Sequence, residues 1–119
     1  MDIVERNYGH VTVLDLKGRL VVEDGFQTLR EEVNRLVAEG RVYIVLNLDG
    51  LTYLDSSGVG LIASKYVSAR RHDGDLKLCN LHPRSFKVLD ITRLLTIFES
   101  FDNEKDAVAS FPAQPLSSS

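Results

Sequence analysis

Aliphatic and β-branched residues gather in short runs along the chain, and these runs predict β-strands. The expected strands cover residues 3–8, 10–16, 42–48, 76–81 and 96–98. Gly9 permits a turn between the first two strands, which we interpret as an antiparallel hairpin, and Gly18 closes the second. The run from Val42 to Leu48 is almost continuously apolar, which is typical of a central parallel strand covered on both faces.

Between these runs, apolar residues recur at helical spacing and predict amphipathic helices. The first expected helix, residues 24–38, ends at Gly40 and carries its apolar face on Phe26, Leu29, Val33, Leu36 and Val37. A second helix is expected over residues 57–71. Pro83 opens a short helix, and Asn103 is expected to be the N-cap of the last one.

Strands and helices alternate from residue 10 onward, which predicts an α/β fold. Right-handed crossovers then give a mixed, mostly parallel sheet with an antiparallel N-terminal edge and about four helices. Residues 1–111 are expected to form a single domain. Residues 112–119, rich in Pro and Ser, have the composition of a disordered C-terminal tail.

Composition and charge narrow the classes of function. A net charge of −3 argues against a nucleic-acid partner, and the nearest basic group, Lys65 with Arg70 and Arg71, is expected to be a solvated helix end. Neither a signal peptide nor a membrane span is recognisable. The single cysteine, Cys79, is expected to be a buried thiol in a reducing compartment. The expected location is therefore the cytoplasm.

Small and polar residues between a strand and a helix mark the candidate site, residues 55–60. Connections at the carboxyl ends of strands are where ligands and partners meet open α/β sheets. In a structural interpretation, Ser56 or Ser57 caps the helix, and Gly58 and Gly60 allow close packing on the sheet or close approach by a partner.

A functional interpretation starts from a phosphate on Ser56. A helix N-terminus tolerates an anion, because its free N–H groups and its dipole favour negative charge. The fold should therefore survive phosphorylation. A partner bound at Ser56, beside the charge of Asp55, would instead face an added dianion, which makes this position suitable for a switch.

Several segments together resemble the STAS domain, the anti-sigma-factor antagonist family. They are Leu46-Asn47-Leu48, Tyr53-Leu54, Asp55-Ser56-Ser57-Gly58-Val59-Gly60, Gly18-Arg19-Leu20, Leu76-Lys77-Leu78 and Leu94-Leu95-Thr96-Ile97-Phe98. The similarity extends over residues 3–111. Its most specific element is the Asp-Ser-Ser-Gly sequence followed by an aliphatic residue and Gly.

The resemblance implies a mechanism in which Ser56 is phosphorylated by a serine-kinase anti-sigma factor and restored by a serine phosphatase. The unphosphorylated chain would bind the anti-sigma factor and release a sigma factor. Asp55 would help to engage the kinase, while Ser57 and Gly58 would form the helix entry. The sequence departs from the family pattern at Val21 and Val22, which we expect to be exposed as partner contacts or as a strand end.

Two other classes of function are weighed against this one. An enzyme is disfavoured, because Ser56 lacks a nucleophile-elbow sequence and no histidine has a neighbouring partner pattern. No catalytic residue, metal site or cofactor is expected. The alternative is a STAS interaction or scaffold subunit that is never phosphorylated, in a signalling or transport-regulating complex. The expected oligomeric state is a monomer or a weak dimer.

Overall fold

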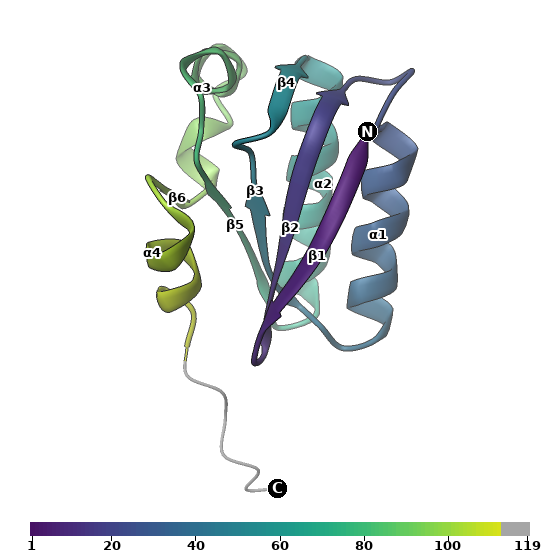
Figure 1. The fold of residues 1–119 in the computed structure, drawn as a ribbon, viewed down its shortest axis with the longest axis vertical. Helices are drawn as coiled ribbons and strands as arrows, with labels where there is room; N and C mark the ends of the chain where they lie inside the picture. Colours follow the sequence, from purple (N-terminus) through teal and green to yellow (C-terminus); the bar gives the residue numbers. More distant parts are fainter. Residues whose placement is uncertain (113–119) are drawn as a thin grey trace, which may run out of the picture.

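A six-stranded mixed sheet forms the centre of the protein, in a computed structural model that describes residues 1–112 (Figure 1). The strands are β1 (Asp2–Tyr8), β2 (Val11–Leu20), β3 (Tyr43–Asn47), β4 (Leu51–Leu54), β5 (Asp75–Cys79) and β6 (Ser100–Phe101). Their order is β1-β2-β3-β5-β6, and β4 pairs with the end of β2. Only β1 and β2 pair antiparallel, so the predicted sheet with its antiparallel N-terminal edge is confirmed.

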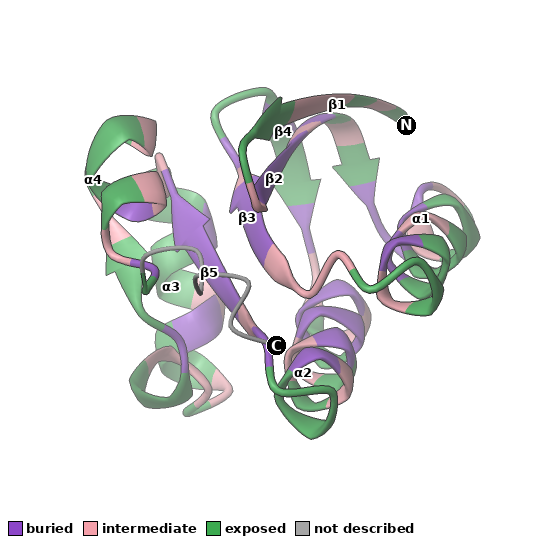
Figure 2. Ribbon diagram, turned by 90° about the horizontal axis from the view of Figure 1, so that it is seen from below, coloured by how far each residue is buried: buried purple, intermediate pink, exposed green. Residues whose placement is uncertain are grey.

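Helices cover both faces of this sheet (Figures 1 and 2). They are α1 (Phe26–Ala38), α2 (Ser56–Arg71), α3 (Pro83–Ile91) and α4 (Glu104–Ala109). Side chains of α1, α2 and α3 form one apolar cluster with the sheet, and α4 packs in a second cluster on the opposite face. β2, β3, β4 and β5 run toward the upper side of Figure 1, where α2 and α3 begin.

The alternation of side chains along the strands explains the two clusters. Leu14, Leu46 and Leu78 point to the face of α1 and α2, where they are fully buried. Val45 and Cys79 point to the face of α4. Cys79 is buried as expected, and burial raises the pKa of its thiol to about 12.

Two predicted strand boundaries are wrong. Gly18 does not close β2 but lies within it, at a positive φ of 111°, where the register to β4 shifts. The chain continues as a strand there because β4 supplies a new pairing partner. Residues 95–97 form a short 3₁₀ helix, η1, and not part of the expected strand over 96–98; β6 follows and pairs with β5.

Lys65 is not the solvated residue that the charge pattern suggested. It is 8% exposed, and its Nζ donates a hydrogen bond to Asn34 Oδ1 at 2.7 Å, across the contact between α1 and α2. Burial lowers the pKa of its ammonium group. The expected cationic helix end is therefore reduced to Arg70 and Arg71, both of which are exposed.

The predicted tail begins at Pro112, and residues 113–119 lie outside the described residues. Within residues 1–112, no helix has the length and apolar character needed to cross a membrane.

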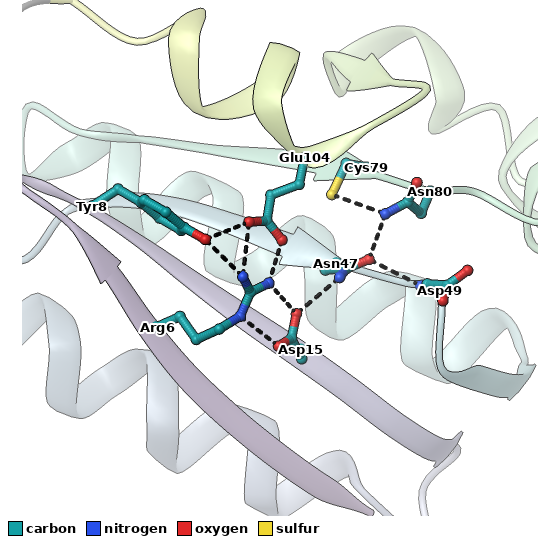
Figure 3. A network of polar contacts seen from close by, with 8 residues as sticks. All are labelled: Arg6, Tyr8, Asp15, Asn47, Asp49, Cys79, Asn80 and Glu104. Carbon is teal, nitrogen blue, oxygen red and sulfur yellow. Dashed lines mark hydrogen bonds and ion pairs between the residues drawn. The ribbon is translucent and has the colours of Figure 1, made fainter.

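Charged side chains attach the start of α4 to the first two strands (Figure 3). Arg6 donates hydrogen bonds to both carboxylate oxygens of Asp15 at 2.7 Å and also bonds Glu104, the first residue of α4. Tyr8 and Asn47 complete the group, donating at 2.8 Å to Glu104 and Asp15 respectively. Hydrogen bonds from Arg6 hold the pKa of both carboxyl groups below their usual range.

A buried lysine attaches the other end of α4. Lys77, in β5, is 4% exposed and donates to the hydroxyl of Ser110 at 2.9 Å and to its carbonyl oxygen at 3.2 Å. Its ammonium nitrogen lies 4.5 Å from the centre of the Phe111 ring. Polar contacts therefore hold this six-residue helix at both ends.

Candidate functional site

Asp55 is the N-cap of α2. Its backbone is extended, with φ −113° and ψ −178°, and its Oδ1 accepts a hydrogen bond from the N–H of Gly58 at 2.9 Å. Its carbonyl oxygen accepts the next helical bond, from the N–H of Val59 at 3.0 Å. One residue thus supplies both the side-chain cap and the first backbone acceptor of the helix.

The expectation that Ser56 or Ser57 caps the helix is wrong. Both residues already belong to α2, so neither has the extended backbone that lets a cap side chain reach forward. Ser56 is exposed, and its hydroxyl has no hydrogen-bond partner in the described part of the chain. The carboxylate of Asp55 performs the capping and leaves the Ser56 hydroxyl available.

The two glycines of the motif have different surroundings. A Cβ on Gly58 would lie 2.5 Å from the carbonyl oxygen of Leu20 and 2.8 Å from a methyl group of Leu54. Gly58 is buried, so it allows the first helical turn to pack on the sheet and offers no surface to a partner. A Cβ on Gly60 would meet nothing within 4 Å, and Gly60 is exposed one helical turn after Ser56.

The turn that follows β2 lies beside the start of α2. Leu20 pairs with Leu54 in parallel register and also lies against Gly58, so the turn after β2 leaves the sheet close to the first turn of α2. Val22 is 60% exposed, as expected, whereas the expected exposure of Val21 is wrong, since Val21 is 2% exposed. Backbone hydrogen bonds in both directions between Val21 and Asp24 hold Val21 inward.

The site therefore consists of three exposed positions, Val22, Ser56 and Gly60, which we call the Ser56 surface. Asp55 lies at its edge and is half-buried, and Ser57 is also half-buried. Tyr53, 47% exposed, precedes the motif and belongs to the segments that resemble the family, but it was not predicted as a site residue; the Arg19 guanidinium lies 5.8 Å from its ring centre. The sequence signal for it was an aromatic residue two positions before the motif.

The three histidines of the described chain lie in contact with backbone carbonyl groups. The ring nitrogens of His10, His72 and His82 each donate to a backbone carbonyl oxygen, at distances of 2.7, 2.8 and 2.6 Å. Within residues 1–112, none of the three histidines makes a hydrogen bond to the Ser56 hydroxyl. Among residues 1–112, no group of three or more His, Cys, Asp or Glu side chains could hold a metal ion.

Fold and site together define a class: a mixed α/β domain that presents an exposed serine hydroxyl, that of Ser56, at a helix entry. The sequence profile described as "STAS domain" matches residues 3–107. The chain belongs to the STAS domain family.

Relatives and solved structures agree with this assignment. The chain is 35% identical over 66 residues to the anti-sigma F factor antagonist of Paenibacillus polymyxa, covering 56% of each chain. It is 32% identical over 71 residues to the anti-sigma-B factor antagonist of Bacillus subtilis, covering 60% of this chain and 64% of that one. Each alignment thus covers less than two thirds of the relative. The structure of the Bacillus cell fate determinant SpoIIAA in its phosphorylated form has the same fold, with a TM-score of 0.71, 23% identity and coverage of 91% and 97% of the two chains.

Proposed function

We propose that this chain is an anti-sigma-factor antagonist controlled by phosphorylation at Ser56. The unphosphorylated form binds an anti-sigma factor and thereby releases a sigma factor, and phosphorylation ends that binding. The observation that carries the proposal is the free, exposed hydroxyl of Ser56 at the start of a helix that Asp55 already caps. The names of the relatives support the choice of partner.

The start of α2 is suited to carry a phosphate. Within residues 1–112, the backbone N–H groups of Ser56 and Ser57 have no backbone acceptor. Free N–H groups at a helix start and the positive end of the helix dipole both stabilise an anion. The first turn has no acidic residue of its own to repel it. Phosphorylation of Ser56 is therefore expected to leave the domain folded.

A bound partner would experience the phosphate differently. The group adds about −1.5 to −2 charges at neutral pH beside the carboxylate of Asp55. A partner packed over the Ser56 surface would have to desolvate this charge without a matching cation, which costs about 2–5 kcal/mol of binding free energy. The absence of a side chain at Gly60 lets that partner approach closely, so the added charge cannot be avoided.

The same proposal fixes the roles of the other components. The anti-sigma factor is the serine kinase and uses ATP as its own substrate, and a serine phosphatase restores the hydroxyl. The chain itself performs no catalytic step and needs no cofactor. It acts in the cytoplasm, where sigma factors meet RNA polymerase, and it acts as a monomer or a weak dimer.

Phosphorylation in vitro tests the site. The wild-type chain, incubated with its cognate kinase and ATP, is expected to gain a single phosphate, measured by intact mass. Ser56→Ala should abolish the gain, and Ser57→Ala should preserve it, which makes Ser57 a matched control one residue away. A phosphate retained in Ser56→Ala would contradict the assignment of Ser56.

Binding of the partner tests the switch. Ser56→Ala should bind the anti-sigma factor as tightly as wild type, whereas Ser56→Asp should bind at least tenfold more weakly by calorimetry, because it places a charge at the interface. A non-phosphorylated scaffold subunit would bind its partner equally with either substitution. Equal affinity of all three proteins would therefore favour the scaffold.

A further inference from the structure

A pocket of about 670 Å³ lies between β4 and the start of α3, apart from the exposed face of α2. The elements that line it, β4 and the start of α3, lie at the upper side of Figure 1. Leu51, Leu54 and Val88 give it an apolar wall. Its volume falls within the range of about 300–1,000 Å³ that small-molecule sites occupy.

Free backbone donors of α3 face this end of the sheet. Pro83 is the first helical residue and has no N–H. Within residues 1–112, the N–H groups of Arg84 and Ser85 have no backbone acceptor; the first helical bond is made by Phe86, whose N–H donates to the carbonyl of His82 at 2.9 Å. No side chain caps the helix. Two N–H groups and the positive end of the helix dipole therefore lack an anionic partner.

A buried hydroxyl supplies an independent reason to expect a ligand. Ser85 is only 5% exposed, lines the pocket, and has no hydrogen-bond partner for its hydroxyl in the described residues. The hydroxyl is therefore available to form a hydrogen bond with a group in the pocket. In the described residues, every side-chain oxygen that is sealed from solvent has a hydrogen bond. The Ser85 hydroxyl has none, so it is not sealed, and it is accessible from the pocket that Ser85 lines.

Charges around the pocket favour an anion. Arg84 lines the pocket and makes only a long contact, 3.5 Å, to the carbonyl oxygen of Thr52 on the opposite wall. His82 donates to the backbone carbonyl of Asp49 at 2.6 Å. Asp49 contributes the one carboxylate among the lining residues, and its side chain is 73% exposed, so solvent screens its charge.

We propose that this pocket binds a small organic anion. Its phosphate or carboxylate group accepts hydrogen bonds from the first turn of α3 and from the Ser85 hydroxyl, and pairs with the Arg84 guanidinium. The apolar body of the ligand packs against Leu51, Leu54 and Val88. The site does not depend on phosphorylation of Ser56, so Ser56→Ala is expected to bind the ligand as wild type does.

Titration of the ¹⁵N-labelled full chain tests the site, with phenyl phosphate and benzoate as probes. At least one probe should shift the amide resonances of Arg84 and Ser85 saturably, and the tighter probe identifies the preferred anionic group. Inorganic phosphate, which has no apolar body, should bind at least tenfold more weakly. Arg84→Gln should weaken binding of the preferred probe at least fivefold, and Ser85→Ala at least twofold.

Arg71→Gln provides the matched control, since Arg71 is exposed at the far end of α2. It should leave the affinity unchanged. The proposal would be overturned if neither organic probe gave a saturable shift at α3, if inorganic phosphate bound as tightly as the organic probes, or if Arg84→Gln and Arg71→Gln had equal effects.

Discussion

Helices α2 and α4 begin in the same way but use their first residue differently. Asp55 caps α2 and Asn103 caps α4, each side chain accepting from the backbone N–H three residues later, at 2.9 and 2.8 Å. The next residue in α2 is Ser56, whose hydroxyl is free. The next residue in α4 is Glu104, which Arg6 and Tyr8 hold in place.

This difference separates a side chain that the fold uses from one that the fold leaves without contacts. Replacing the side chain of Glu104 removes contacts between α4 and the sheet, whereas replacing that of Ser56 removes none in the described chain. The start of α2 is fixed instead by the backbone contact that Gly58 makes possible. Mutations at the two helix starts should therefore affect stability to different degrees.

The largest loss of stability is expected for Gly58→Ala. Its Cβ would lie 2.5 Å from the Leu20 carbonyl oxygen, a backbone atom that cannot move without disturbing β2. Overpacking of this kind costs about 1–3 kcal/mol, which urea denaturation would measure. Gly60→Ala is the control, and it should stabilise the chain by about 0.5–1 kcal/mol, because its Cβ meets open space. Equal effects of the two substitutions would refute the distinction between the buried and open sides of α2.

Arg6→Gln should have the next largest effect. It leaves the carboxylates of Asp15 and Glu104 close together without their cation, and their side chains are only 18% and 22% exposed. Allowing for solvent screening of Arg6 itself, we expect a loss of about 1–2 kcal/mol in the free energy of unfolding. The control Arg35→Gln removes ion pairs of a more exposed arginine and should cost about 0.5 kcal/mol or less.

Acid should reduce the advantage of wild type over Arg6→Gln. The pKa values of Asp15 and Glu104 are lowered by hydrogen bonds from Arg6. These two carboxylates therefore stabilise the fold above their unfolded pKa values, 3.8 and 4.5, and lose that contribution as pH falls through their lower folded values. Denaturation series from pH 7 to pH 3 should show the two proteins converging, and a constant difference would contradict this account.

The smallest effect on stability is expected for Ser56→Asp. Its carboxylate would lie at the positive end of the α2 dipole without displacing any contact, so the free energy of unfolding should change by no more than about 0.5 kcal/mol. Calorimetric melting of the purified variant would measure this. A loss above about 1 kcal/mol would mean that Ser56 serves the fold after all.

Most of the architecture could be predicted from periodicity. The apolar face of α1 is confirmed, with Leu29, Val33 and Leu36 buried, as is Asn103 as the cap of α4. The structural predictions that failed concern residues whose contacts lie far away in the sequence. Gly18 could not be recognised as a strand residue without β4, which pairs with the end of β2.

At the candidate site, the helix entry was predictable but its local geometry was not. The motif indicated a helix entry, yet only the backbone angles distinguish Asp55 as the cap from the two serines. Val21 and Val22 are alike in sequence, and the backbone bonds to Asp24 bury one of them. Lys65 was predicted to be solvated because the sequence of its own helix does not reveal the contact with Asn34 of α1.

The buried thiol beneath α4 has a practical consequence. Cys79 packs with Ala107 and Phe111, and its raised pKa, about 12, leaves very little thiolate at neutral pH. An alkylating reagent can therefore react with it appreciably only while α4 is lifted from the sheet. As the only cysteine of the chain, it makes the labelling rate a natural kinetic probe of how often this face of the sheet opens.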